Sequence, residues 1–278
     1  MAKRRLRQVP SNSPADGRQL ISNPLSAISD RLSANTRITV LTGAGVSAAS
    51  GVPTFRGAGG LWKNFRPETL ATADAFSRDP RLVWEWYAWR RSLIAACEPN
   101  EAHRVLAEWS RRFPQFKLIT QNVDGLHESA FARVTSRQAG PSDVIRLHGS
   151  IWEVSCWQRC KMSPARWRDE RTTFPEMPPR CPHCGDLIRP GVVWFGESLD
   201  PDVVSVAADA TDCDVFITVG TSAVVYPAAG FLEQAKRNGA FTVEINPEAT
   251  PATHSVDLVL QGGAETILPQ LDKLIMTV

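Results

Sequence analysis

The chain has 278 residues, of which 43% are hydrophobic, and a formal net charge of +2 at pH 7. This length allows one large domain, or one large and one small domain. The nearly balanced charge lacks the basic excess typical of nucleic-acid-binding proteins, and no run is apolar enough to cross a membrane. Four of the six cysteines form two close pairs, which indicates metal binding rather than a secreted disulfide framework.

Residues 1–17 are basic at their start and continue into Ser, Pro and Asn. They lack the apolar segment of a secretory signal peptide, so we expect a flexible basic tail on a cytoplasmic protein. The stretch is rich in Arg and has no acidic residue before Asp16. A mitochondrial transit peptide, and therefore the mitochondrial matrix, is the alternative.

Hydrophobic periodicity predicts a helix after about Gly17, and a run rich in Trp, Tyr and Arg predicts another at 81–96. Short apolar runs predict buried strands at 38–41, 118–120, 144–147, 215–219, 242–245 and 256–260. Strands that alternate with helices predict an α/β fold with an open, mostly parallel sheet. The cysteine-containing region 151–189 interrupts this alternation and is expected to be an inserted module.

Polar or glycine-bearing steps follow the predicted strand ends. They lie at 43–45, 121–124, 148–149, 220–222 and 246–248. Ligands of parallel sheets bind beyond the carboxyl ends of the strands. We therefore expect these scattered segments to form one site.

The first of these segments is a glycine loop. Gly43 and Gly45 would let backbone N–H groups approach phosphate oxygens closely, and a helix that starts there would favour the negative charge. Ala48 stands where the usual dinucleotide motif has its third glycine, so the motif is incomplete. A tight strand-to-helix turn is the alternative.

The next two segments carry groups suited to chemistry on a bound ligand. Gln121, Asn122 and Asp124 supply amide and carboxylate groups from one short loop. A neutral imidazole at His148 can accept a proton at physiological pH. Taken singly, an Asn-x-Asp step is also typical of a turn, and His148 or His127 could be structural.

The cysteine pairs are Cys156 with Cys160 and Cys181 with Cys184. Four thiolates on two short loops suit one tetrahedral zinc ion, and a closed site of this kind is structural rather than catalytic. The Cys-x₃-Cys spacing of the first pair is one residue longer than the Cys-x₂-Cys spacing of the second. A redox disulfide at either pair is the alternative, and a zinc ribbon with interleaved Arg and Trp could also belong to a nucleic-acid-binding module.

Residues 43–56 (GAGVSAASGVPTFR), 121–127 (QNVDGLH) and 148–149 (HG) together resemble the sirtuins, the NAD-dependent protein-lysine deacylases. The resemblance covers about residues 20–270. It implies a Rossmann-like, doubly wound domain made of 18–60, 107–150 and 190–278, which binds NAD as co-substrate. A helical module, 61–106, and the zinc-binding module, 151–189, would form the smaller inserted domain around one structural zinc ion.

The resemblance also implies the roles of single residues. His148 would deprotonate a ribose hydroxyl after the acyl oxygen attacks the ribose, with Asn122 and Asp124 in the same catalytic site. The products would be nicotinamide, free lysine and O-acyl-ADP-ribose. NAD binding would fall to Gly43, Ala44, Gly45, Ser47, Thr54, Phe55, Arg56, Trp62, Gln121, Asn122, Asp124, Gly220, Thr221, Ser222, Asn246, Glu248 and Ala264.

Tyr87 and Arg90, one helical turn apart, match the Tyr-x-x-Arg signature of the class III sirtuins. In that branch the pair binds the terminal carboxylate of succinyl-, malonyl- or glutaryl-lysine. The same branch shares residues 54–60 (TFRGAGG) and 192–197 (VVWFGE). The second of these would place Val193, Trp194 and Phe195 against the substrate peptide.

The expected partners are acylated lysine side chains of proteins, with no specific nucleic acid and no membrane, and the expected state is a monomer. A general deacetylase and a mono-ADP-ribosyltransferase are the alternatives within NAD chemistry. On spacing alone, the helix face that carries Tyr87 and Arg90 could equally be a solvated one.

Overall fold

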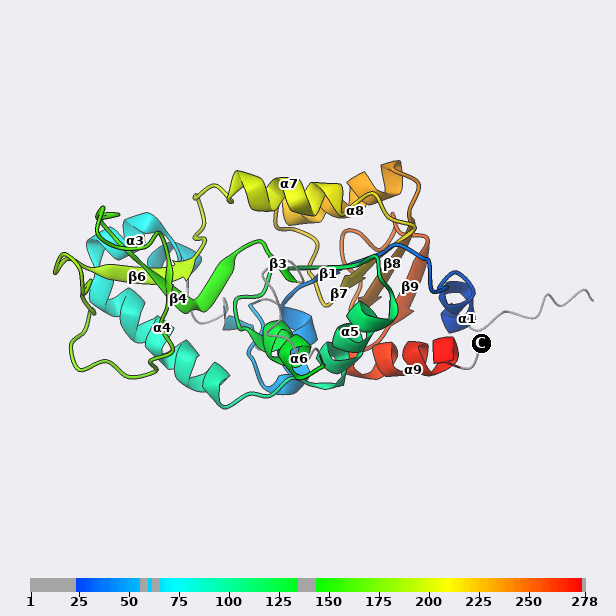
Figure 1. Cartoon of the computed structure of the whole chain (residues 1–278), viewed down its shortest axis with the longest axis horizontal. Coiled ribbons are helices and arrows are strands. Elements are labelled where there is room, and N and C mark those ends of the chain that lie inside the picture. The colour runs from blue at the N-terminus through cyan, green and yellow to red at the C-terminus, as the bar shows by residue number, and fades with distance from the viewer. Residues whose placement is uncertain (1–23, 56–59, 62–65, 135–143, 277–278) are drawn as a thin grey trace, which may run out of the picture.

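The computed structural model describes residues 24–55, 60–61, 66–134 and 144–276. A six-stranded, wholly parallel sheet forms the larger of two lobes (Figure 1), in the order β3-β2-β1-β7-β8-β9. Its strands are β1 (Ile38–Thr42), β2 (Phe116–Thr120), β3 (Val144–Arg146), β7 (Val215–Val219), β8 (Phe241–Asn246) and β9 (Leu258–Gln261). The chain winds outward from β1 to β3 and then returns to β7 on the other side of β1. The strand order therefore reverses between β1 and β7, where doubly wound sheets bind their ligands.

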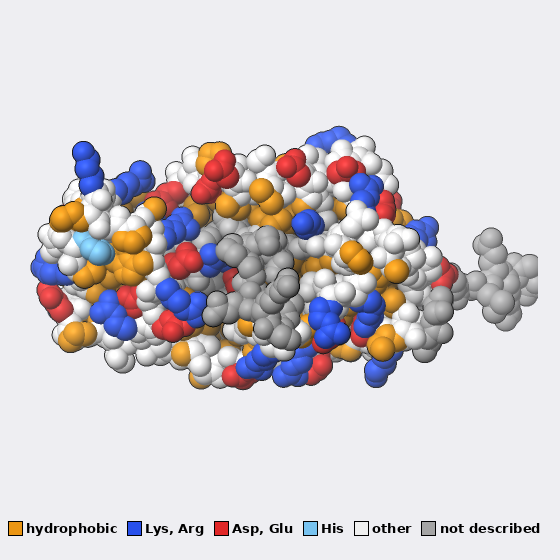
Figure 2. Space-filling view, viewed as in Figure 1, with side chains coloured by type: hydrophobic (Ala, Val, Ile, Leu, Met, Phe, Trp, Pro, Cys, Tyr) orange, Lys and Arg blue, Asp and Glu red, His pale blue; other side chains and the backbone are white. Residues whose placement is uncertain are grey.

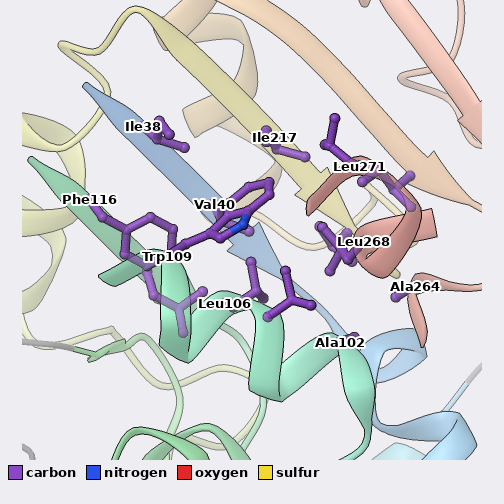
Figure 3. Close-up of a cluster of buried hydrophobic side chains, with 14 of the residues drawn as sticks. Ile38, Val40, Ala102, Leu106, Trp109, Phe116, Ile217, Ala264, Leu268 and Leu271 are labelled. Atoms are coloured by element: carbon purple, nitrogen blue, oxygen red, sulfur yellow. The ribbon is translucent and has the colours of Figure 1, made fainter. Parts of the chain in front are cut away.

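Both faces of this sheet are covered by helices, which is why every residue of β1 and β7 is buried. One face packs against α1 (Pro24–Ser29), α5 (Glu101–Arg112), α6 (Leu126–Val134) and α9 (Ala264–Met276). Figure 3 shows part of this core, where Trp109 and Leu106 of α5 meet Ile38 and Val40 of β1. The other face packs against α7 (Pro201–Asp209) and α8 (Ala228–Arg237).

The smaller lobe holds a three-stranded antiparallel sheet in the order β5-β4-β6. Its strands are β4 (Gly149–Cys156), β5 (Trp167–Arg168) and β6 (Ile188–Val192), and its helices are α2 (Pro67–Leu70), α3 (Ala73–Arg78) and α4 (Pro80–Ala95). Arg91 ties α4 to this sheet because its buried guanidinium binds the Ile151 carbonyl oxygen and the Asp169 carboxylate. The lobe thus has its own core, centred on Trp84, Val154 and Ile188.

The predicted fold class is confirmed, since the six expected strands form one parallel sheet and the cysteine region forms a separate small sheet. The helix expected after Gly17 begins at Pro24 within the described residues, and the predicted tail lies outside them. The predicted limit at 106/107 falls inside α5, whose residues Ala102 and Leu106 pack in the core of the larger lobe. The limits at 150/151 and 189/190 likewise fall inside β4 and β6.

In the part of the chain that the structure describes, no helix combines the length and apolar character needed to cross a membrane. On the face seen in Figure 2, basic and acidic side chains are interspersed, and no single large basic patch stands out. This distribution agrees with the balanced net charge.

Candidate active site

A cavity of about 1240 Å³ lies at the carboxyl ends of the parallel strands. The loops after β1, β2, β3, β7 and β8 all contribute to its lining, and the smaller lobe closes it from the side with residues of α4 and of the segment after β6. The switch point of the sheet and the cavity therefore coincide, as the sequence predicted from the polar steps at the strand ends.

The glycine loop makes direct contact with the loop after β7. The Gly43 amide donates to the Val219 carbonyl oxygen at 3.0 Å, and the Gly45 amide donates to the Gly220 carbonyl oxygen at 2.8 Å. A Cβ atom on Gly43 would lie 2.8 Å from the Gly220 oxygen, and one on Gly45 would lie 2.7 Å from the Gly220 Cα. These two glycines are therefore needed for the close approach of the two loops, and their amides are engaged within the protein rather than free for phosphate.

A short 3₁₀ helix, η1 (Ala44–Ser50), follows the glycine loop in place of a long helix. Ala44 and Gly220 both line the cavity. Any side chain larger than hydrogen at Gly220 would collide with the start of η1, because a Cβ atom there would lie 2.5 Å from the Val46 amide nitrogen. A glycine is therefore needed here, as at Gly43 and Gly45, for the loop after β7 to pack against the start of η1.

Thr221 joins the two sides of the switch point. Its hydroxyl oxygen accepts from the Gln121 side-chain amide at 2.9 Å, and its carbonyl oxygen accepts from the Asn246 side-chain amide at 2.8 Å. All three residues line the cavity. The amide groups predicted from sequence to touch a ligand are therefore held in place by one another.

Asn122 is fixed by two donated hydrogen bonds. Its side-chain nitrogen lies 3.1 Å from the Gly43 carbonyl oxygen and 3.2 Å from the Ser47 hydroxyl oxygen. Both amide hydrogens are thus used, and the Asn122 side-chain oxygen is left as an acceptor at the cavity. Ser47 itself donates to the Asp124 carboxylate at 2.8 Å. Ser47 and Asp124 are buried and do not line the cavity; they lie behind Asn122.

His103 of α5 completes this buried network and was not singled out from the sequence. Its Nδ1 accepts from the Asn100 backbone amide, so the hydrogen of the neutral ring lies on Nε2, 3.3 Å from the Ser47 hydroxyl. Burial lowers the pKa of His103 to about 4, which keeps the ring neutral. The sequence gives one indication of His103, which is a polar residue on the buried face of an amphipathic helix. That indication does not show which group the ring contacts.

His127 is also buried beside His103, with its Nε2 at 3.0 Å from the Thr42 hydroxyl oxygen. It does not line the cavity. Burial holds the pKa of His127 well below its ordinary value of 6.5. These contacts support the structural interpretation of this histidine.

His148 lines the cavity at the end of β3. Its Nδ1 lies 2.9 Å from the Gln121 carbonyl oxygen, and a carbonyl oxygen can only accept. Nδ1 therefore carries the hydrogen of the neutral ring, and Nε2 keeps a lone pair. Burial lowers the pKa of His148 below its ordinary value of 6.5, although the hydrogen bond to Gln121 acts in the opposite direction. The ring is thus neutral at physiological pH and able to accept a proton.

Tyr87 and Arg90 enter the cavity from α4, and only 3% and 6% of their surfaces are exposed. The Arg90 guanidinium carbon lies 4.8 Å from the ring centre of Phe55 and 5.0 Å from that of Trp86. In the described part of the chain, Arg90 forms no ion pair. Burial lowers the pKa of its guanidinium, because charge is costly away from water. The helix face is therefore not a solvated one.

The segment after β6 borders the same cavity. Its backbone amides are already engaged: Val193 donates to the His148 carbonyl oxygen, Trp194 to the Glu197 carboxylate and Phe195 to the Ala71 carbonyl oxygen. A peptide that paired with this segment would therefore donate to backbone carbonyl groups of the segment, of which that of Trp194 already accepts from the Glu197 amide at 3.0 Å. Phe195 is 45% exposed at the edge of the cavity.

The four paired cysteines converge in the smaller lobe. Their sulfur atoms all lie within 4.8 Å of one another, with 3.6 Å between Cys156 and Cys184 and 4.0 Å between Cys160 and Cys181. A tetrahedral zinc ion with Zn–S distances of about 2.3 Å places its sulfur ligands about 3.8 Å apart. The cluster therefore fits one zinc ion. The extra residue of the Cys-x₃-Cys spacing is accommodated by Arg159, whose φ is 49°.

The remaining cysteines and the nearby histidine stay outside this cluster. Cys97 and Cys213 are free thiols, and burial raises the pKa of Cys213 to about 11. His183 is exposed and packs edge-on against Trp167. The zinc site lies apart from the large cavity, since none of its cysteines lines that cavity.

Other residues predicted to bind a dinucleotide also reach the cavity. Thr54, Phe55, Ser222, Glu248 and Ala264 all line it. Arg56 and Trp62 lie outside the described residues.

Residues 43–227 match the sequence profile of the Sir2 family. The chain belongs to this family. It is 52% identical to an NAD-dependent protein deacylase of Aquifex aeolicus over 239 residues, which cover 85% of this chain and 94% of that protein. Among solved structures it is similar to a Sir2 homologue in complex with NAD, with a TM-score of 0.77, 42% identity and coverage of 91% of this chain and 93% of the other. A mutant Sir2 homologue in complex with ADP-ribose gives a TM-score of 0.79 at 42% identity, over 91% of this chain and 95% of that one.

In this Sir2-family protein the cavity at the strand ends receives Tyr87 and Arg90 from α4, and the cysteine cluster lies apart from it.

Proposed function

We propose that this Sir2-family protein is an NAD-dependent protein-lysine deacylase that prefers acyl groups ending in a carboxylate, namely succinyl, malonyl and glutaryl. The observation that carries the acyl preference is Arg90, a buried guanidinium that lines the cavity, forms no ion pair among the described residues and meets the Asp124 carboxylate only through longer-range attraction. A buried charge without a partner is costly, and proteins retain one where a ligand supplies the counter-charge.

Bound NAD would supply the ribose that receives the acyl group, with release of nicotinamide. The residues that would hold it are the ones around the switch point. Gly220 lets the loop after β7 pack against the glycine loop, and both loops border the region where the phosphates would lie. Gln121, Thr221 and Asn246 form a linked polar wall in the same cavity. We assign the nicotinamide-ribose end to the region of Asn122, whose side-chain oxygen is presented as an acceptor by its two donated hydrogen bonds.

His148 is the proposed general base. Because its Nδ1 hydrogen is donated to the Gln121 carbonyl oxygen, its Nε2 can take a proton from a ribose hydroxyl. The lowered pKa keeps this nitrogen unprotonated at physiological pH. Deprotonation lets the ribose oxygen receive the acyl group, and with the uptake of one water molecule the products are free lysine and O-acyl-ADP-ribose, in addition to nicotinamide.

Ser47, Asp124 and His103 support this site from behind rather than by touching the ligand. The Asp124 carboxylate accepts a hydrogen bond from the Ser47 hydroxyl, and the Ser47 oxygen accepts one from the Asn122 side-chain amide. We therefore assign to Asp124 a role in orienting Asn122, in place of direct contact with the reacting atoms.

The acyl group would lie between His148 and α4. A terminal carboxylate there could accept two parallel hydrogen bonds from the Arg90 fork and a third from the Tyr87 hydroxyl. An acetyl group has no charge to offer, and a long fatty acyl chain would leave Arg90 desolvated and unpaired. The cavity therefore favours short dicarboxylic acyl groups.

Mass spectrometry of matched peptides tests this proposal. Acetyl-, malonyl-, succinyl- and glutaryl-lysine peptides are incubated separately with the protein and NAD. We expect loss of the acidic acyl groups at least tenfold more efficiently than loss of acetyl, together with O-acyl-ADP-ribose. Equal or better removal of acetyl would make the protein a general deacetylase, and ADP-ribose attached to protein would make it a mono-ADP-ribosyltransferase.

A further inference from the structure

Trp194 makes one specific polar contact with the proposed acyl site. Its indole nitrogen lies 3.0 Å from the Tyr87 hydroxyl oxygen, and only 2% of the Trp194 surface is exposed. Both residues line the cavity, although they come from different elements, α4 and the segment after β6. The contact therefore forms only when the smaller lobe folds.

The direction of this hydrogen bond follows from the chemistry of the two groups. An indole N–H can only donate, whereas a phenol can both donate and accept. The Tyr87 oxygen is therefore the acceptor, and its own hydrogen must point elsewhere. Among the described residues, no acceptor receives that hydrogen. Burial raises the pKa of Tyr87, so the phenol keeps its proton at physiological pH.

The indole ring is itself clamped. The Arg189 guanidinium carbon lies 3.6 Å from the Trp194 ring centre. Arg189 in turn forms two hydrogen bonds to the Glu197 carboxylate, which also accepts from the Trp194 backbone amide at 2.8 Å. With its backbone and one ring face held by the same ion pair, the indole has little freedom to turn away from Tyr87.

We propose that Trp194 is a positioning residue for acyl selectivity: its indole holds the Tyr87 oxygen as an acceptor, so that the phenol hydrogen is donated to the acyl carboxylate beside Arg90. Without the indole, the phenol could rotate and offer its lone pairs to the carboxylate, which would be repulsive. The inference rests on the proposed preference for acidic acyl groups and goes beyond it by naming what orients the second donor.

A double-mutant cycle tests the proposal. Trp194→Phe keeps an aromatic ring but removes the N–H donor and some buried volume, and the double-mutant cycle and the Trp84→Phe control separate these two effects. At saturating NAD, we expect it to lower kcat/KM for a succinyl-lysine peptide about three- to ten-fold, the effect of one neutral hydrogen bond. The loss should appear in KM with little change in kcat, because the carboxylate is bound alike in the ground and transition states.

The same substitution in a Tyr87→Phe protein should lower kcat/KM less than about two-fold, since no hydroxyl remains to be oriented. If Trp194→Phe lowers kcat/KM equally in both backgrounds, or lowers succinyl and acetyl turnover by the same factor, Trp194 acts by packing and the inference is overturned. Should Trp194→Phe fail to fold, Trp194→Met, which also lacks a donor, takes its place in the cycle.

Trp84→Phe is the matched control. Trp84 is a buried tryptophan of the same lobe whose indole donates to the Ile188 carbonyl oxygen at 2.7 Å, away from Tyr87. It should leave the ratio of succinyl to acetyl efficiency unchanged, and a change as large as that of Trp194→Phe would contradict the proposal. If the wild-type protein does not remove succinyl groups, the proposed acyl preference is refuted. If it removes them but the effects of Trp194→Phe and Tyr87→Phe are additive, only the role of Trp194 is refuted.

Discussion

Replacing Arg90 by Met tests the proposed acyl preference most directly. Met fills a similar volume with an apolar chain and removes the guanidinium. Arg90 is 6% exposed, and its charge lies near the Phe55 and Trp86 rings without a direct ion pair in the described residues. A succinyl carboxylate that enters the altered cavity would leave water and find only the Tyr87 hydroxyl.

The magnitude follows from this geometry. Removing one partner of a buried, hydrogen-bonded charge pair costs about 2–5 kcal/mol. Because Tyr87 remains as a second donor, we expect the lower part of this range, about 2–3 kcal/mol, which corresponds to about a 30- to 150-fold loss of kcat/KM. An acetyl group forms no such pair, so its efficiency should change less than about three-fold.

The assay is the ratio of desuccinylation to deacetylation efficiency, measured on the same peptide sequence at saturating NAD. Arg90→Lys serves as an intermediate, since it keeps the charge but loses the planar fork. If Arg90→Met lowers both activities by the same factor, the arginine is structural and the chain is a general deacetylase.

The unfolding temperature distinguishes the role of Arg90 from that of its neighbour Arg91. Arg91 is fully buried but bonded to the Asp169 carboxylate at 3.2 Å and to the Ile151 carbonyl oxygen at 2.8 Å. Arg91→Met leaves that carbonyl unpaired and Asp169 with Arg171 as its remaining cationic partner, so it should lower the unfolding temperature clearly. Arg90→Met removes a desolvated charge that has no partner and should leave that temperature unchanged or raise it. A large fall for Arg90→Met would contradict the assignment of Arg90 to ligand binding.

Three further predictions concern the proposed base His148, the zinc site and the buried His103. His148→Ala should lower turnover about 10²–10⁴-fold in a folded protein. The acid limb of the wild-type kcat/KM profile against pH should lie below pH 6.5, because burial lowers the pKa of His148. Near wild-type turnover in the variant, or an acid limb above pH 6.5, would exclude His148 as the general base. Metal analysis should find about one zinc ion per chain in the wild type and in Cys213→Ala, and less in Cys181→Ala. The free energy of unfolding should fall only in the variant that loses zinc. A metal-free and fully stable wild type would refute the four-thiolate site. His103 takes up a proton near pH 4 in the folded protein and near pH 6.5 in the unfolded chain. Its contribution to the free energy of unfolding is therefore fully present above pH 6.5 and falls by up to about 3 kcal/mol toward pH 4. Denaturant unfolding should show a smaller fall in His103→Gln, and a fall identical to that of the wild type would place the titration at another residue.

Local features of the sequence were sufficient for the fold class and for the place of the site. The strands are continuous apolar runs that end at polar or glycine-bearing steps, and both signals lie within a few residues of one another. Because parallel strands all present their carboxyl ends at one edge, those steps had to converge there. The cysteine spacing similarly located a metal site that the sulfur positions bear out. The family resemblance, carried by residues 43–56 and 121–127, is confirmed by the match to the Sir2 family.

Tertiary structure alone decided which polar groups face the cavity and which lie behind it. Ser47 and Asp124 belong to the same motifs as Gly43 and Asn122, yet they are buried in a network with His103, which lies on a distant helix. The glycines proved to serve the contact between two loops that are about 175 residues apart in the chain. Arg90 and Arg91 are adjacent in sequence, but within the described residues only Arg91 forms a direct ion pair with an acid. Such differences depend on which distant segment packs opposite each side chain, and the burial that this packing creates sets the pKa, the hydrogen-bond direction and the cost of an unpaired charge.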